Sequence, residues 1–471
     1  MNIEVVVLSA GLGTRMRSSL PKVLHRICGV PMLQHVLNAL YRLGPRKIVI
    51  VVGEHIQEIK DCLVLSDSVV FAYQEKARGT ADALRKALPL LSEFNETILV
   101  INGDAPLITA ETLRKFLSLH KRENNSLSVL SFESEKPGTY GRIVRDYDGR
   151  LISIKENRDV TAMERSIREV NSGIYAFERD AAKLLGRVQL NKSKGEYYLT
   201  DVVRITVKEG VKTAAFCIGS EDEFMGINTQ EELERARQFM RHKIIRGHMA
   251  RGVNFVDGNS AFIDMDIEIG SDTVIYPNVY LEGNTRIGKG CILYPNVRIF
   301  DSVVEHGAVI KDSTLIENAV VKRRATIGPF AHLRPGTEIG KDAKIGNFVE
   351  VKKSVVGPRT KALHLTYLGD SMIGANVNVG AGTITCNYDG YQKNTTTIED
   401  NVFVGSDSQL IAPVRIGKGA YVGAGATITK DVPDNALALS RVPQKNIEGW
   451  VLKRKLKVKS EKLNVKKKKK T

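Results

Sequence analysis

After residue 250, aliphatic side chains return mostly at every sixth position, in several series. These residues are Ile269, Ile275, Leu281, Ile287, Leu293 and Ile299, then Val304, Ile310, Ile316, Val321, Ile327, Leu333, Ile339, Ile345 and Val351, and finally Ile398, Val404, Leu410, Ile416, Val422 and Ile428. A period of six is neither helical nor strand-like, and it is typical of a parallel β-helix built from hexapeptide repeats. We predict such a β-helix, left-handed, over residues 251–452, with roughly eighteen residues in each triangular coil and one shared apolar core.

Two stretches interrupt this series, Gly357–Thr366 and Thr385–Thr397. A solenoid accepts insertions as loops that project from its surface, and such loops often carry function. We therefore expect functional side chains in both stretches, against the alternative that they are tolerated surface insertions.

The sequence before residue 250 alternates short apolar runs with helical patterns. The strand-like runs include Ile3–Leu8, Lys47–Val52 and Thr97–Ile101, and the helical patterns include Met32–Leu43, Thr80–Leu91 and Ala110–His120. Such alternation predicts an α/β, Rossmann-like domain with a mostly parallel sheet over residues 1–229. Thr229 with Glu232 forms a capping-box pattern, which predicts a helical arm over residues 230–250 between the two domains.

Cysteine and hydropathy patterns indicate where such a chain resides. The cysteines are scattered and form no C-x-x-C pair, which argues against a disulfide framework and a structural zinc site. They are Cys28, Cys62, Cys217, Cys291 and Cys386. No apolar run is long enough for a transmembrane segment, and Met1–Ala10 lacks the features of a signal peptide. We expect a cytoplasmic protein.

The net charge of +16 is concentrated at one end of the sequence. Residues 453–471 hold eleven lysines and arginines and one acid, Glu461, so most of the excess charge lies there. A terminal block of like charge is usually a solvated, disordered tail, and that is what we predict for it. Nonspecific contact with an anionic membrane or nucleic acid is the alternative, whereas no specific nucleic-acid binding is expected.

A glycine-rich loop follows the first apolar run. It reads Leu8-Ser9-Ala10-Gly11-Leu12-Gly13-Thr14-Arg15-Met16, with Pro21-Lys22 downstream. This is neither a Walker A loop nor a dinucleotide fingerprint. Its glycines allow the backbone to close on a nucleotide, while Arg15 and Lys22 supply cations for phosphates. The alternative is a structural turn with exposed basic residues.

Asn102-Gly103-Asp104 comes directly after the strand-like run Thr97–Ile101. The carboxyl end of a parallel strand is where open α/β sheets bind ligands. A carboxylate there suits Mg²⁺, and Asn228 offers a second oxygen. An isolated Asp after a strand is also a common turn former, so this pattern is weak on its own.

Together these residues resemble the sugar-nucleotide pyrophosphorylases. With the hexapeptide half added, residues 3–450 resemble the GlmU family of bifunctional N-acetylglucosamine-1-phosphate uridyltransferases and glucosamine-1-phosphate acetyltransferases. The motifs that carry the resemblance are the glycine-rich loop, Gln74 with Gly79-Thr80-Ala81, Gly195-Glu196-Tyr197-Tyr198-Leu199-Thr200-Asp201, Gly346-Asn347-Phe348-Val349-Glu350, His364-Leu365-Thr366-Tyr367-Leu368-Gly369-Asp370 and Thr383-Ile384-Thr385-Cys386-Asn387-Tyr388-Asp389-Gly390.

The resemblance implies synthesis of UDP-N-acetylglucosamine for peptidoglycan and lipopolysaccharide, with UTP and acetyl-CoA as co-substrates and Mg²⁺ as cofactor. Arg15 and Lys22 would assist uridylyl transfer, and Asp104 and Asn228 would bind Mg²⁺. The residues implied to bind UTP and the sugar nucleotide are Leu8, Ser9, Ala10, Gly11, Lys22, Gln74, Gly79, Thr80, Asn102, Gly103, Asp104, Gly141, Glu156, Asn171 and Asn228.

For the β-helix, the resemblance implies that His364 is the general base for acetyl transfer, because an imidazole can accept a proton near neutral pH. The residues implied to bind glucosamine-1-phosphate are Arg334, Lys352, Tyr367 and Asn378. Those implied to bind acetyl-CoA are Ala381, Asn387, Tyr388, Ser406, Ala424 and Arg441. The family pattern also implies a homotrimer formed through the β-helix.

Three residues depart from the family pattern. Ser9 stands where Ala is common, Asp82 where His is frequent, and Asn102 where some members have an aromatic residue. They leave the expected metal ligands and base untouched, but they bear on sugar or base preference.

Two other interpretations are less favoured. In one, only nucleotidyl transfer survives and the β-helix is a regulatory platform, as in ADP-glucose pyrophosphorylases; the intact His364 and Asn387 motifs argue against it. In the other, the chain is a non-catalytic scaffold, similar to certain translation-factor subunits. Loss of Arg15, Lys22 or Asp104 would favour the scaffold, and all three residues are present.

Overall fold

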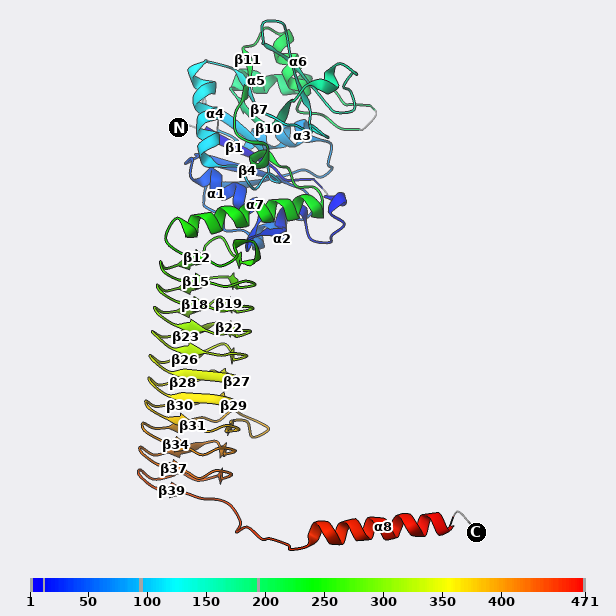
Figure 1. The fold of residues 1–471 in the computed structure, drawn as a ribbon. Coiled ribbons are helices and arrows are strands. Elements are labelled where there is room, and N and C mark those ends of the chain that lie inside the picture. The colour runs from blue at the N-terminus through cyan, green and yellow to red at the C-terminus, as the bar shows by residue number, and fades with distance from the viewer. Residues whose placement is uncertain (1–2, 12, 93–95, 193–194, 469–471) are drawn as a thin grey trace. The chain divides into compact units, whose positions relative to one another are not determined.

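The computed structural model divides into two compact units, which are described separately (Figure 1). Unit 1 comprises residues 1–271 and 275–285, and unit 2 comprises residues 272–274 and 286–471. The structure describes residues 3–11, 13–92, 96–192 and 195–468, with side chains as far as Lys462. Leu12 of the glycine-rich loop lies outside the described residues.

Unit 1 is built on a mostly parallel sheet. Among the described residues its order is β11-β7-β10-β6-β1-β4-β5, with β8 and β9 joined at β10. The strands are β1 (Ile3–Leu8), β4 (Lys47–Val52), β5 (Val69–Tyr73), β6 (Thr97–Asn102), β7 (Leu127–Glu133), β8 (Arg142–Arg145), β9 (Leu151–Lys155), β10 (Glu169–Phe177) and β11 (Thr213–Cys217), beside a small pair, β2 (Arg26–Ile27) and β3 (Val30–Pro31). Strand β10 is antiparallel to β6 and β7, whereas β1 is parallel to β4 and β6.

Helices cover both faces of this sheet, because successive strand residues point to opposite sides. Val5 and Val7 belong to one hydrophobic core with α1 and α4, while Val6 belongs to a second core with α3 and α6. The helices are α1 (Met32–Tyr41), α2 (Ile56–Cys62), α3 (Thr80–Ala87), α4 (Ala110–Arg122), α5 (Arg179–Lys183), α6 (Asp201–Lys208) and α7 (Gln230–Met249). The predicted α/β architecture is confirmed.

Helix α7 begins with the predicted capping box. The Thr229 hydroxyl accepts a hydrogen bond from the Glu232 backbone N–H, and the Glu232 carboxylate accepts one from the Thr229 N–H. Leu233, Ala236 and Met240 are buried on one side of the helix, in a core that also contains Met16 and Met32. The arm therefore packs along unit 1 through an apolar stripe.

The hexapeptide half forms stacked coils of short parallel strands, as Figure 1 shows. Most aligned core residues are 17 or 18 positions apart. Ile287 pairs with Val304 and Val321 with Ile339. Their side chains are buried along the stack, so the predicted β-helix with one continuous core is confirmed.

The strands of this half have two or three residues, with two longer exceptions. They are β12 (Asn254–Phe255), β13 (Phe262–Ile263), β14 (Glu268–Ile269), β15 (Val274–Ile275), β16 (Tyr280–Glu282), β17 (Arg286–Ile287), β18 (Ile292–Leu293), β19 (Arg298–Phe300), β20 (Val303–Val304), β21 (Val309–Ile310), β22 (Leu315–Glu317), β23 (Ala319–Val321), β24 (Thr326–Ile327), β25 (His332–Leu333), β26 (Thr337–Ile339), β27 (Lys344–Lys352), β28 (Val355–Val356), β29 (Lys361–Gly369), β30 (Ser371–Ile373), β31 (Asn378–Val379), β32 (Ile384–Cys386), β33 (Thr396–Ile398), β34 (Phe403–Val404), β35 (Gln409–Ile411), β36 (Val414–Ile416), β37 (Tyr421–Val422), β38 (Thr427–Ile428) and β39 (Leu437–Ala438).

The first predicted interruption is not a projecting loop. Strand β29 lies in register with β27, with Ala362 beside Ile345 and Leu368 beside Val351. The expectation of a loop was wrong because the inward position is taken by Ala362, whose side chain is smaller than the aliphatic residues that mark the repeat elsewhere. The second interruption is a true insertion, since the coil that joins Ile373 to Ile398 is 25 residues long.

Residues 450–468 form helix α8, where the sequence predicted a disordered tail from residue 453. The segment contains no Gly or Pro, and Lys and Leu are good helix formers. Residues 469–471 lie outside the described residues. No helix in the part of the chain that the structure describes is long and apolar enough to cross a membrane.

Candidate active sites

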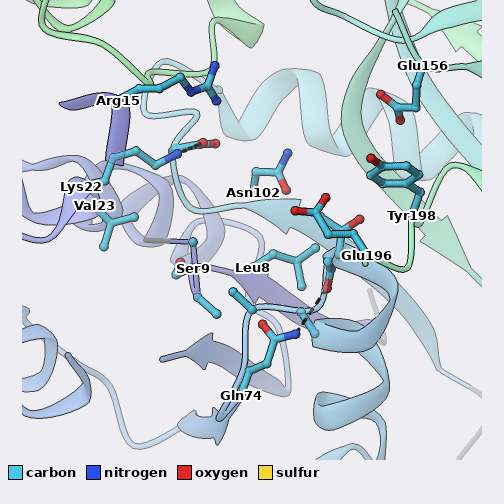
Figure 2. A pocket seen from close by; sticks show the side chains of 17 residues that line it. Leu8, Ser9, Arg15, Lys22, Val23, Gln74, Asn102, Glu156, Glu196 and Tyr198 are labelled. Carbon is cyan, nitrogen blue, oxygen red and sulfur yellow. Dashed lines mark hydrogen bonds and ion pairs between the residues drawn. The ribbon is translucent and has the colours of Figure 1, made fainter. Parts of the chain in front are cut away.

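A cavity of about 470 Å³ opens at the carboxyl ends of the parallel strands of unit 1 (Figure 2). Leu8 ends β1, Asn102 ends β6 beside it, and Gln74 follows β5. The residues that line it are Leu8, Ser9, Ala10, Gly11, Arg15, Lys22, Val23, Gln74, Ala77, Gly79, Thr80, Ala83, Asn102, Asp104, Glu156, Glu196 and Tyr198. Most of the predicted nucleotide-binding residues are therefore gathered around one space, at the edge of the sheet where ligands bind in open α/β folds.

One end of this cavity is cationic. Lys22 Nζ lies 2.5 Å from Asp104 Oδ2 and 3.0 Å from Asn228 Oδ1. Arg15 Nη2 also donates to Asn228 Oδ1, over 3.0 Å. Asp104 Oδ2 and Asn228 Oδ1 thus both contact the Lys22 ammonium, so the two oxygens are close enough together to bind one cation.

The same two oxygens fit Mg²⁺ by chemistry. Mg²⁺ prefers hard oxygen ligands and usually takes only one or two from the protein, with water and phosphate completing the set. Among the described residues no three His, Cys, Asp or Glu side chains form a metal-binding group. A divalent ion here would rest on Asp104, Asn228 and the oxygens of a substrate.

At the opposite end, the described residues that line the cavity include no lysine or arginine. Gln74 is 4% exposed there, and its Nε2 donates to Asp82 Oδ2 over 2.7 Å. Gly79, at the start of α3, has φ +97°, and a Cβ there would lie 2.5 Å from the Tyr197 carbonyl oxygen. Only glycine allows this close approach of the Gly79 loop to Tyr197.

The third side of the cavity is acidic. Thr200 Oγ1 donates to Glu156 Oε1 over 2.8 Å. Burial raises the pKa of Glu156, and the Thr200 bond partly opposes that shift. Glu196 and Tyr198 complete this side; their motif was recognised in the sequence, but neither residue was predicted to bind substrate.

Four predicted residues do not line the cavity directly. A Cβ at Gly103 would meet Ser9 Oγ, so Gly103 lets two strand ends approach each other. The Asn171 backbone N–H donates to the Gly141 carbonyl oxygen over 2.9 Å, and Asn171 Nδ2 donates to Tyr175 OH. Asn228 reaches the site through Arg15 and Lys22.

In unit 2, His364 stands exposed on β29 beside Asn347 of β27. His364 Nδ1 lies 2.9 Å from Asn347 Oδ1. Because an amide oxygen only accepts, Nδ1 carries the hydrogen and the neutral ring keeps a lone pair on Nε2. This is the tautomer that a general base requires.

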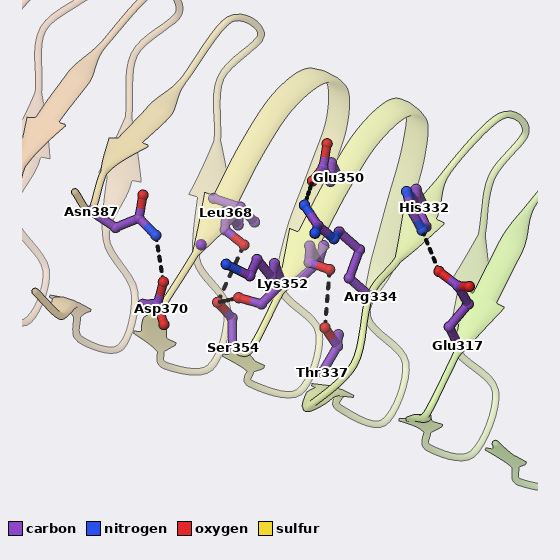
Figure 3. Close-up of polar contacts among 12 residues, drawn as sticks. Glu317, His332, Arg334, Thr337, Glu350, Lys352, Ser354, Leu368, Asp370 and Asn387 are labelled. Carbon is purple, nitrogen blue, oxygen red and sulfur yellow. Dashed lines mark hydrogen bonds and ion pairs between the residues drawn. The ribbon is translucent and has the colours of Figure 1, made fainter. Parts of the chain in front are cut away.

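The predicted sugar-phosphate residues lie on neighbouring coils. Arg334 Nη1 is 2.8 Å from Glu350 Oε1 (Figure 3). Glu350 lies beside Tyr367 in the strand register. The neighbouring Lys393 side chain lowers the pKa of Lys352, through a hydrogen bond and through its positive charge. Such a pair is suited to an anion.

Lys393 was missed by the sequence analysis. It lies in the 25-residue coil, within the second stretch that interrupts the repeat. That interruption was the available signal, but nothing in the sequence places Lys393 beside Lys352.

The predicted acetyl-CoA residues spread over successive coils. Asn387 is buried and its Nδ2 donates to Asp370 Oδ2 (Figure 3). Tyr388, the next residue, is exposed. Arg441 Nη1 donates to the Ala424 carbonyl oxygen over 3.2 Å.

The sequence matches known family models in both halves. Residues 4–223 match the nucleotidyl transferase family, and residues 266–301, 318–353 and 395–430 match the bacterial transferase hexapeptide repeat. The chain is 48% identical to the bifunctional protein GlmU of Thermodesulfovibrio yellowstonii over 452 residues, which are 96% of this chain and 99% of the relative. The chain belongs to the GlmU family.

Other GlmU relatives match over a similar extent. The GlmU of Geotalea uraniireducens is 43% identical over 96% of this chain and 100% of the relative. That of Geobacillus sp. is 44% identical over 95% of this chain and 97% of the relative. Membership of GlmU therefore covers both units.

Proposed function

We infer that the chain is a bifunctional enzyme that makes UDP-N-acetylglucosamine in two steps. The hexapeptide half transfers acetyl from acetyl-CoA to the amine of glucosamine-1-phosphate. The N-terminal half then transfers uridylyl from UTP to N-acetylglucosamine-1-phosphate and releases pyrophosphate. The observation that carries this conclusion is the match of both halves of one chain to relatives named as bifunctional.

For uridylyl transfer we propose that Arg15 and Lys22 neutralise the phosphates. A phosphate oxygen of the sugar substrate attacks the α-phosphorus of UTP; one P–O bond forms as the bond to pyrophosphate breaks. No protein nucleophile is needed, because holding the reactants in line and neutralising charge can supply the catalysis. The polar groups of Asn102, Glu156 and Asn171 would hold the sugar.

We propose that Asp104 and Asn228 hold Mg²⁺. Bound there, the ion would neutralise the phosphate oxygens and stabilise the pyrophosphate that leaves. The convergence of both oxygens on the Lys22 ammonium supports this assignment.

For acetyl transfer we propose that the sugar amine attacks the thioester carbon of acetyl-CoA, so that a C–N bond forms as the C–S bond breaks and coenzyme A leaves as its thiolate. His364 Nε2 accepts the proton that the amine loses. Asn347 would hold the ring in the correct tautomer, which its 2.9 Å contact with Nδ1 supports. Arg334, Lys352 and Lys393 would bind the sugar phosphate through charge. Tyr367 and Asn378 would complete that site.

For acetyl-CoA we propose a binding surface along successive coils, with contacts from Ala381, Asn387, Tyr388, Ser406, Ala424 and Arg441. Exposed Tyr388 and Arg441 offer an aromatic ring and a cation to the nucleotide part of the cofactor. We also propose a cytoplasmic homotrimer associated through the β-helix. Exposed Phe330, Phe348 and Leu365 leave apolar surface for a neighbouring copy.

The direct test gives purified protein glucosamine-1-phosphate, acetyl-CoA, UTP and Mg²⁺, and follows both products by mass spectrometry. We expect N-acetylglucosamine-1-phosphate first and UDP-N-acetylglucosamine second. Chelation of the metal should stop the second product and spare the first. If protein supplied with all four components formed neither product, the proposed function would be wrong.

A further inference from the structure

The side-chain amide of Gln74 is fixed in one orientation. Its Nε2 lies 2.7 Å from Asp82 Oδ2 and 3.3 Å from the Gly79 carbonyl oxygen. Both partners are acceptors, and an ionised carboxylate cannot donate a hydrogen bond. The NH₂ group of Gln74 must therefore face Asp82 and Gly79, and the amide cannot turn over without placing oxygen against oxygen.

The carbonyl oxygen of Gln74 is consequently left to the cavity. No hydrogen bond to Gln74 Oε1 is found within the residues that the structure describes, although the residue is 4% exposed and lines the cavity. Figure 2 shows this oxygen on the side of the amide away from the bonded nitrogen. This oxygen has no protein partner among those residues and is accessible from the cavity, so it can accept a hydrogen bond from a ligand that brings an N–H donor.

The charges of the cavity indicate which part of a nucleotide meets this oxygen. Lys22 and Arg15 attract phosphates at the far end, whereas Gln74 is accompanied by Ala77, Gly79 and Ala83. A flat, uncharged base suits these small residues, so the base is expected at Gln74 when the phosphates lie at Lys22.

We propose that Asp82 determines base specificity by holding Gln74 Oε1 toward the N3 position of the pyrimidine. Uracil has an N3–H that donates to this oxygen. Cytosine has a lone pair at N3, which would face the lone pairs of Oε1 and repel them. The inference rests on the proposed nucleotidyl transfer and assigns a function to Asp82, one of the three departures from the family pattern.

The test measures the affinities of UTP and CTP by calorimetry with Mg²⁺ present, for the wild type, Asp82→Asn and Asp82→Ala. Asn has nearly the shape of Asp but can donate to Oε1, which permits the Gln74 amide to turn over. Ala removes the Asp82 carboxylate, which is the closer of the two acceptors of Gln74 Nε2. We expect the ratio of UTP to CTP affinity to fall about tenfold in both variants, the size of a typical hydrogen-bond mismatch at a base.

The matched control is Asp61→Asn. Asp61 Oδ1 accepts from Gln57 Nε2 over 2.8 Å, a bond of the same kind on the exposed face of α2, outside the cavity. The ratio of UTP to CTP affinity of Asp61→Asn should equal that of the wild type. An unchanged ratio in both Asp82 variants overturns the inference. Nucleotide affinity and product formation are measured separately. If the wild type binds UTP more tightly than CTP but forms no sugar nucleotide, the proposed function is contradicted and the inference about Asp82 is not.

Discussion

At the scale of single residues, the closest contact in the first site is between a lysine and the proposed metal ligands. The Lys22 ammonium touches both Asp104 and Asn228, and its side chain is only 12% exposed. A divalent ion that binds both oxygens must displace this ammonium, because two cations cannot occupy one position. When a nucleotide is present, its phosphates offer Lys22 another partner.

We therefore expect Lys22→Met to bind Mn²⁺ more tightly than the wild type when no nucleotide is present, by about tenfold or more, since an opposing unit charge has been removed. Electron paramagnetic resonance of free Mn²⁺ measures this directly. Lys76→Met, which removes an exposed lysine of the same domain, serves as control. Equal or weaker Mn²⁺ binding by Lys22→Met would show that the ammonium does not compete with the metal.

At the scale of secondary-structure elements, helix α7 contains a pH-sensitive group. His248 is 2% exposed, and burial together with the neighbouring Arg251 lowers its pKa to about 4. An unfolded chain binds this proton with a pKa near 6.5, so the neutral imidazole contributes stability above that pH. The contribution is lost as the pH falls from about 6.5 toward 4.

We predict that the melting temperature of the wild type falls more steeply between pH 7 and pH 5 than that of His248→Gln, which has no titrating ring. Differential scanning calorimetry at several pH values measures the difference. His242→Gln, which replaces an exposed histidine of the same helix bonded to Asn259, should follow the wild type. Parallel pH profiles for the wild type and His248→Gln would contradict this account of α7.

The secondary-structure elements also show which features of the fold the sequence pattern predicts and which it does not. A period of six predicts the β-helix because every sixth side chain must fill a shared core, and the structure confirms it. The expected loop around His364 was wrong, since Ala362 meets the packing requirement with a small side chain. Helix α8 was not predicted because helix propensity and charge repulsion act in opposite directions over one lysine-rich segment.

For the candidate sites, strand ends were predictable and distant neighbours were not. Leu8 and Asn102 end adjacent parallel strands, so the sequence pattern alone indicates that they meet. By contrast, the pairing of Gln74 with Asp82 depends on how α3 packs after β5, and Lys393 reaches Lys352 only through the fold of an insertion. Spacing along the chain carries no signal for such contacts.

At the scale of the whole molecule, we propose that one chain holds two sites whose chemistry is independent. Asp104 belongs to unit 1 and His364 to unit 2. The proposed uridylyl transfer does not involve the His364 imidazole, and the proposed acetyl transfer does not involve Asp104 or Asn228. Damage to either site should therefore leave the other reaction intact.

The most direct test measures both reactions separately in His364→Ala and Asp104→Ala, each as a purified full-length protein. We predict that His364→Ala loses acetyl transfer by at least about a hundredfold, the usual contribution of a general base, and keeps uridylyl transfer. Asp104→Ala should do the reverse. Acetyl transfer at the wild-type rate in His364→Ala, or the loss of both reactions in either variant that still folds, would contradict the account of two independent sites.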